Sequence, residues 1–113
     1  MSSLRKLFVD YLEAYAAKNL ELVSAMFADD IQLRDWKISV SGKATAVAET
    51  RKNFASAGSI AIEILRTCES DDTVAGELRI LVDNTEVLYV VDVVSFNQEG
   101  KINAIRAYIG RED

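Results

Sequence analysis

Asp92 is an acidic residue in a stretch that otherwise predicts a buried strand. Alternate residues of a strand share one face. The face of Asp92 is shared by the apolar side chains of Leu88, Val90, Val94 and Phe96. An ionised carboxylate is costly to bury without partners, so such a group takes up a proton or faces a polar cavity. A structural alternative stays open, in which the backbone, Arg79 or Arg106 satisfies a core acid.

Asp35 lies near the end of a second segment with the alternation of a strand, Ile31 to Trp36. Ile31, Leu33 and Asp35 point the same way, which directs this carboxyl group toward the protein interior. An exposed aspartate is common where a strand enters a turn, so a structural role for Asp35 competes with a functional one.

Tyr11 lies in the middle of an amphipathic stripe with the spacing of a helix face. The stripe consists of Leu4, Leu7, Phe8, Tyr11, Leu12 and Tyr15. A buried tyrosine ring is ordinary core, but its hydroxyl seeks a hydrogen-bond partner. A phenol and a neutral acid can both donate to an oxyanion, and an ionised acid can accept a proton. Tyr11, Asp35 and Asp92 together predict a proton-transfer site between helix and sheet.

Three helices are expected in the first half of the chain. The first runs from Ser3 to Lys18, and Asn19 caps a shorter second helix that ends in a turn at Asp29-Asp30. The second helix buries Leu22, Val23, Met26 and Phe27. After a break at Ser41-Gly42, a third helix is expected over Ala44–Ala57, with Gly58 in the left-handed position that often ends a helix. Its inner side is expected to hold Ala44, Val47, Ala48 and Phe54.

The second half of the chain predicts four antiparallel strands joined by hairpins. Turn signals separate the stretches Ile60–Glu69, Thr73–Val82, Glu86–Phe96 and Ile102–Ile109. Helices that precede a run of hairpin strands indicate an α+β fold, in which the helices cover one face of a curved antiparallel sheet. We expect residues 1–113 to form a single domain of this class.

Both faces of the predicted strand Glu86–Phe96 are apolar, which indicates a pocket on one face of the sheet and a partner on the other. The expected wall of the pocket is formed by Leu33, Leu78, Ile80, Val82, Leu88, Val90, Val94, Ile105, Ala107 and Ile109. Such a wall suits a small apolar ligand. The opposite face carries Val87, Tyr89, Val91 and Val93. A half-exposed sheet would not be apolar there, so we expect a homodimer through this outer face.

Composition narrows the range of partners. A formal net charge of −5 argues against nucleic acid, and no apolar run is long enough for a membrane helix. With no histidine and with Cys68 as the single cysteine, neither a metal site of the Cys/His kind nor an internal disulfide is expected. A cytoplasmic location and chemistry without a metal or cofactor are the resulting expectations.

Short motifs along the chain add a resemblance to a known family. They are Phe27-Ala28-Asp29-Asp30, Ser41-Gly42-Lys43 before a helix, and Phe96-Asn97 with Gly100-Lys101 before the final strand. The chain resembles the nuclear transport factor two-like superfamily, in its SnoaL-like and ketosteroid isomerase-like branch. The resemblance implies a cone-shaped α+β barrel, or ketosteroid isomerase-like roll, with three N-terminal helices, a deep apolar pocket and frequent dimers.

Residue by residue, the resemblance implies roles for the three candidate residues. Tyr11 matches the oxyanion tyrosine of ketosteroid isomerases, Asp35 their catalytic base and Asp92 their protonated oxyanion aspartic acid. Asp35 would then remove a proton beside a carbonyl group and return it further along the conjugated system. Two departures are that Trp36 stands where the isomerases usually have proline, and that no tyrosine lies near Thr50 to support Tyr11.

Other branches of the superfamily imply other activities. Dehydratase-like members use a His/Asp pair, which this histidine-free chain excludes. Epoxide hydrolase-like members use an Asp-Arg-Asp arrangement, for which Arg106 is expected to point outward but Arg79 stays possible. A cyclase-like proton transfer is a further possibility, and so is a non-catalytic domain of the same fold that binds a ligand or a partner.

Overall fold

Polar side chains and a glycine set where the helices begin. The computed structural model describes residues 3–111, and its helices are α1 (Leu4–Ala16), α2 (Leu20–Met26) and α3 (Lys43–Ser56). Ser3 accepts a hydrogen bond from the Lys6 amide and Asn19 one from the Leu22 amide, so each caps its helix. Gly42, which precedes α3, has a φ of 93°, a conformation that side chains disfavour.

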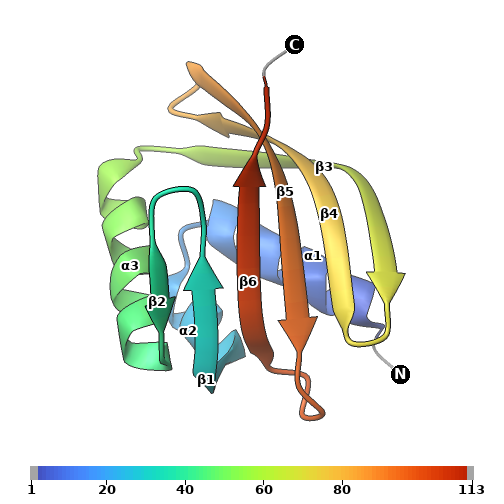
Figure 1. The fold of residues 1–113 in the computed structure, drawn as a ribbon. Helices are drawn as coiled ribbons and strands as arrows, with labels where there is room; N and C mark the ends of the chain where they lie inside the picture. Colours follow the sequence, from blue (N-terminus) through green and yellow to red (C-terminus); the bar gives the residue numbers. More distant parts are fainter. Residues whose placement is uncertain (1–2, 112–113) are drawn as a thin grey trace.

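Within the described residues, six strands form one curved sheet in the order β2-β1-β6-β5-β4-β3 (Figure 1). Their bounds are β1 Phe27–Arg34, β2 Ser39–Ser41, β3 Ile60–Ser70, β4 Thr73–Val82, β5 Glu86–Phe96 and β6 Ile102–Ile109. The three helices lie behind this sheet in the view of Figure 1, and α1 crosses behind β4, β5 and β6. The expected α+β class with three helices preceding the hairpin strands is therefore confirmed.

The sheet differs in two details from the expected curved antiparallel sheet and from the barrel that the resemblance implied. β1 runs parallel to β6, whereas the other neighbouring strands are antiparallel. No hairpin joins β1 to β6, because α3 and three strands intervene along the chain, so local turn chemistry cannot set their direction. The sheet is also open, since β2 and β3 are its edges and do not pair with each other.

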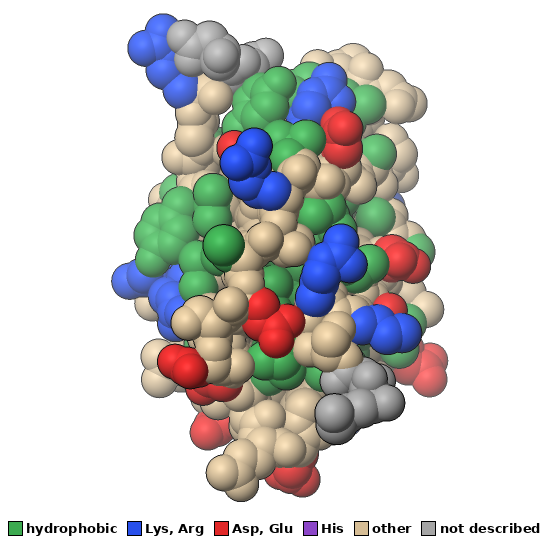
Figure 2. Space-filling model, turned by 90° about the vertical axis from the view of Figure 1, so that its right-hand side faces the viewer, with side chains coloured by type: hydrophobic (Ala, Val, Ile, Leu, Met, Phe, Trp, Pro, Cys, Tyr) green, Lys and Arg blue, Asp and Glu red, His purple; other side chains and the backbone are tan. Residues whose placement is uncertain are grey.

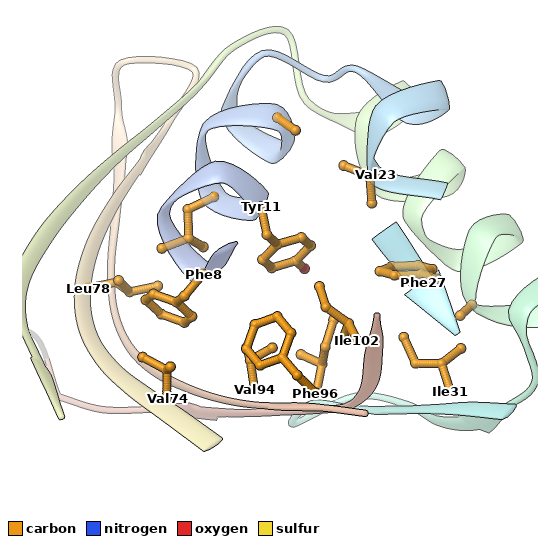
Figure 3. Packing of buried hydrophobic residues seen from close by; sticks show 14 of the residues in the cluster. Phe8, Tyr11, Val23, Phe27, Ile31, Val74, Leu78, Val94, Phe96 and Ile102 are labelled. Carbon is orange, nitrogen blue, oxygen red and sulfur yellow. The ribbon is translucent and has the colours of Figure 1, made fainter. Parts of the chain in front are cut away.

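The core lies between the helices and the concave face of the sheet (Figure 3). Phe8 of α1 is fully buried and packs directly over Gly76 of β4. A Cβ atom at Gly76 would lie 2.4 Å from the Phe8 ring, so only glycine allows the helix to approach the sheet this closely. Tyr11 follows Phe8 by one turn and is therefore held over the same face.

Several local expectations are corrected between α2 and β2. Phe27 begins β1, and Asp29-Asp30 lie within that strand instead of forming a turn. The pairing of β1 with β6 shifts register between Phe27 and Gln32, and this irregularity accommodates the two exposed aspartates. The strand ends at Arg34, before Asp35 and Trp36. The three-residue strand β2 was not expected from the sequence.

The inner face of α3 also differs from the expected one. Its buried residues are Ala46, Thr50 and Phe54, whereas Ala44 is exposed. The Thr50 hydroxyl donates to the Ala46 carbonyl at 2.9 Å, so its hydrogen-bonding capacity is satisfied inside the core. A search for apolar residues alone therefore misses this buried position. Gly58 is not in the left-handed conformation, and its amide instead donates to Asp83 Oδ1 at 2.6 Å.

Candidate functional site

A cavity of about 240 Å³ lies between α1, α3 and the concave face of the sheet. Helix α1 contributes Tyr11, Leu12 and Tyr15 to its lining. The residues expected from the sequence that line it are Leu33, Leu78, Ile80, Val82, Leu88, Val90, Ile105 and Ala107. Trp36 and Lys37, both exposed, also border it.

Val94 and Ile109 do not line this cavity, contrary to expectation. Val94 is fully buried in the packed core, and Ile109 is 44% exposed near the end of β6. Alternation places both on the inner face of the sheet, but the cavity occupies only part of that face. The rest of the inner face is packed against the helices or is left uncovered. The alternation of residues along a strand shows which face is inner, but not which part of that face borders a cavity.

Asp92 lies on the inner face of β5, at the cavity, and is only 9% exposed. It makes no hydrogen bond or ion pair with any other residue in the described range 3–111. Burial raises the pKa of Asp92 to about 7, and the negative charge of Asp35 adds to the shift. Asp92 is thus a carboxyl group that holds its proton far more tightly than an exposed aspartate.

The arginines that might have neutralised Asp92 interact elsewhere. Arg79 approaches Glu63 at 4.0 Å, and Arg106 donates to Ser95 Oγ at 3.4 Å. Arg79 is paired in register with Tyr89 on β5, whereas Asp92 is paired with Gly76, so the two side chains project to opposite faces of the sheet. The Asp-Arg-Asp arrangement considered for epoxide hydrolysis is therefore not formed by Arg79.

Asp35 follows β1 and is built into the turn that leads to β2. Its Oδ1 accepts hydrogen bonds from the amides of Lys37 at 2.7 Å and Ile38 at 2.9 Å. Its own amide donates to the Ile38 carbonyl at 3.0 Å. Oδ2 has no hydrogen-bond partner among the described residues, so one oxygen anchors the group at the cavity wall while the other stays available.

Tyr11 projects from α1 into the interior, where Figure 3 shows its ring among the buried residues. Its ring centroid lies 6.0 Å from that of Tyr15 and 6.4 Å from that of Phe27. The hydroxyl makes no hydrogen bond within the described part of the chain, although it borders the cavity. Burial, with the nearby charge of Asp92, raises the pKa of Tyr11 well above its ordinary value, so the phenol keeps its proton.

Tyr15 is a cavity residue that was read from the sequence only as core. It lies one turn after Tyr11, and its hydroxyl accepts a hydrogen bond from Asn53 Nδ2 at 3.1 Å. Its ring meets that of Phe54 edge to face, with centroids 4.9 Å apart. Burial raises the pKa of Tyr15, and the Asn53 bond partly offsets this rise. The i, i+4 spacing from Tyr11 was the available signal.

The cavity therefore combines an apolar wall with few polar groups. Asp92 and Tyr11 can donate hydrogen bonds, and Tyr15 keeps its own proton while accepting from Asn53. Asp35 presents an oxygen that has no hydrogen-bond partner among the described residues. Such an arrangement can hold a carbonyl oxygen and exchange a proton with a neighbouring carbon. Within residues 3–111, no group of three or more His, Cys, Asp or Glu side chains is arranged to hold a metal ion.

The sequence of this chain matches a known protein family. A family model described as SnoaL-like domain matches residues 8–105. No curated protein is similar enough in sequence to match the chain.

None of the helices in the described range is long and apolar enough to cross a membrane.

Two solved structures share the fold at low sequence identity. An NTF2-like protein of unknown function from Cytophaga hutchinsonii ATCC 33406 is 12% identical with a TM-score of 0.82, over 97% of this chain and 92% of that chain. A candidate ketosteroid isomerase from Kribbella flavida DSM 17836 is 14% identical with a TM-score of 0.83, over 97% of this chain and 79% of that chain. At these identities the likeness establishes the fold alone.

The pKa of Asp92 predicts how stability depends on pH. Below about pH 4 the group is neutral in both states, and between pH 4 and 7 only the unfolded chain releases the proton. The free energy of unfolding should therefore fall over this range, by up to about 4 kcal/mol for a shift of this size, and level off above pH 7. Asp92→Asn should remove this fall, as measured by urea denaturation at a series of pH values.

The matched control for this experiment is Asp30→Asn, which removes an exposed carboxyl group of β1 outside the cavity. It should leave the fall in place. If Asp92→Asn and the wild type showed the same dependence of unfolding free energy on pH, the buried-acid description of Asp92 would be wrong.

Proposed function

The chain belongs to the SnoaL-like domain family, and on that premise we propose that it is a cofactor-free enzyme that moves a proton within a small apolar carbonyl compound. The observation that carries the proposal is Asp92, a buried acid that faces the cavity and has no hydrogen-bond or ion-pair partner in the described range 3–111. A fold that excludes this carboxyl group from water, and raises its pKa to about 7, keeps the group protonated up to about neutral pH, where it can act as a donor.

Asp35 is the proposed base. Its Oδ2 would remove a proton from the carbon next to the carbonyl group, and the electron pair of that C–H bond would move to give a dienolate. The same carboxyl group would then return the proton to the far end of the conjugated system, so that no external acid or base is consumed. Anchoring of Oδ1 by the amides of Lys37 and Ile38 supports this role, because it limits the motion of the group.

Tyr11 and neutral Asp92 are the proposed donors to the dienolate oxygen. Both are buried beside the cavity and lack hydrogen-bond partners among the described residues, so neither has to break a protein contact to bind the substrate. Donors held in a water-poor site stabilise developing negative charge more than donors in water. The apolar wall suits a substrate that is hydrophobic apart from its carbonyl group.

A binding domain without catalysis is the second candidate. One observation favours it: the hydrogen bonds of Asp35 Oδ1 would also be made by an aspartate whose only task is to hold the turn between β1 and β2. In that case the cavity would take an apolar ligand and Asp35 would not exchange a proton with it.

A second proposal concerns assembly and location. We propose that two copies associate through an outer patch, defined as Val87, Tyr89, Val91, Val93 and Tyr108. Val91 and Tyr108 are register partners and are 38% and 49% exposed. Neighbouring apolar side chains on an open sheet face are typical of an interface between subunits. The proposal includes a cytoplasmic setting, which the exposed free thiol of Cys68 would suit.

The test of catalysis is turnover of β,γ-unsaturated ketones, followed by the absorbance of the conjugated product. Wild type should convert at least one ketone of a series with different sizes. Asp35→Asn should lower kcat by about 10²-fold to 10⁴-fold, since it removes the base. Asparagine keeps an oxygen for the Lys37 and Ile38 amides, so the turn should persist. Asp30→Asn should retain full activity.

No turnover by the wild type across the series would defeat the isomerase proposal. Binding of the ketones, measured by calorimetry, would then distinguish the two candidates. Saturable binding that is the same for wild type and Asp35→Asn would favour the binding domain.

The pH dependence of kcat/KM tests the role of Asp92 separately. If neutral Asp92 donates to the oxyanion, kcat/KM should decline as pH rises through about 7, because the carboxyl group loses its proton. Asp92→Asn retains an N–H donor that does not titrate, so its alkaline decline should vanish or move to higher pH. An unchanged decline in this variant would show that another group is responsible.

Light scattering tests the dimer. Val91→Lys places a charge in the middle of the outer patch, opposite its register partner Glu77 on β4, which already pairs with Arg66 and can also interact with the new lysine. Folding should therefore be kept while association weakens at least about tenfold. Leu22→Lys is the control, because Leu22 is apolar and 48% exposed but lies on α2. A strictly monomeric wild type at high concentration would refute the proposal.

A further inference from the structure

The outer face of the sheet carries two arginines side by side. Arg34 on β1 and Arg106 on β6 are register partners in the parallel pair. Neighbouring strands lie roughly 4.8 Å apart, and like charges directly opposite one another destabilise a sheet. In a chain with a net charge of −5, this pairing requires a physical explanation.

Neither arginine has an acidic partner among the described residues. Arg34 donates to the Tyr108 hydroxyl at 2.6 Å and lies over that ring at 5.7 Å, while Arg106 donates to Ser95 Oγ at 3.4 Å. Among the described residues, both guanidinium groups thus have neutral partners only, and most of their N–H donors make no hydrogen bond there.

Other arginines of the sheet are paired with acids. Arg66 lies 3.2 Å from Glu77, and Arg79 lies 4.0 Å from Glu63. Seen from the side of β3 and β4 in Figure 2, positive and negative side chains are interspersed among the hydrophobic ones. Arg34 and Arg106 differ from this pattern, because no carboxylate within residues 3–111 forms an ion pair with either of them.

Arg34 and Arg106 line a surface hollow of about 170 Å³. Besides Arg34 and Arg106, its lining includes the side-chain donors Gln32, Ser39 and Ser41. Ser39 and Ser41 belong to β2 and are the register partners of Arg34 and Gln32. The small side chain of Ala104, which is paired in register with Gln32, leaves room between the donors.

We propose that this hollow, defined by Gln32, Arg34, Ser39, Ser41 and Arg106, binds a small oxyanion of the phosphate or carboxylate type. The planar guanidinium groups match the oxygens of such an anion, and the hydroxyl and amide groups add neutral donors. A bound anion removes the repulsion between the arginines. The site is on the opposite face of the sheet from the proton-transfer cavity, and it does not depend on catalysis there.

Thermal unfolding with inorganic phosphate, sulfate and acetate tests this site, with sodium chloride at matched ionic strength as the reference. Wild type should be stabilised in a saturable way by phosphate or acetate and much less by chloride. A response to phosphate and sulfate alone identifies a tetrahedral anion, and a response to acetate identifies a carboxylate. Arg106→Gln and Arg34→Gln should each raise the apparent Kd at least about tenfold.

Arg79→Gln is the matched control, because Arg79 lies on the same face but is paired with Glu63. It should bind the anion as tightly as wild type. Amide shifts of Ser39, Ser41 and Ala104 on titration provide a second reading that does not require a difference in stability. The proposal is overturned if no oxyanion stabilises wild type more than chloride does, or if Arg106→Gln responds like wild type.

Discussion

The chemistry of the cavity depends on one carboxyl group that the fold shields from water. Asp92 lies on a strand near the middle of the sheet, and the residues of its face from Leu88 to Phe96 are otherwise apolar. A low-dielectric setting disfavours its charge, and the negative charge of Asp35 disfavours it further. The two acids of the cavity therefore differ. Asp35 is held by turn amides, whereas Asp92 has no hydrogen-bond or ion-pair partner within residues 3–111. Two carboxyl groups in one site can act as an acid and a base only when their environments differ in this way.

The placement of α1 determines whether a phenol can join these acids. Phe8 reaches the sheet only because Gly76 has no side chain, and Gly76 is the register partner of Asp92 on β4. Tyr11 then follows one helical turn along the same face and is buried at the cavity. A packing contact between helix and sheet thus sets the spacing between a hydrogen-bond donor and the buried acid.

Periodicity in the sequence was sufficient for α1 and for the four hairpin strands, because each shows its buried face through the spacing of apolar residues. The parity of β5 likewise indicated that Asp92 faces inward. What periodicity could not provide were features set by distant parts of the chain. These include the parallel pairing of β1 with β6, the short strand β2 and the fit of Thr50 into the core. The cavity ends before Val94 because helix packing fills that space.

The parallel pairing has a consequence for how the protein assembles. β6 follows all other strands along the chain, yet it lies between β1 and β5 and connects the β1–β2 pair to the β3–β4–β5 meander. During synthesis these two groups of strands have no common neighbour until β6 emerges from the ribosome. Contacts between segments so distant in sequence close large loops, which slows folding and leaves the edges of β1 and β5 exposed to other chains meanwhile. The order of strands thus keeps the nascent chain vulnerable to aggregation until β6 has been made and can join the two groups.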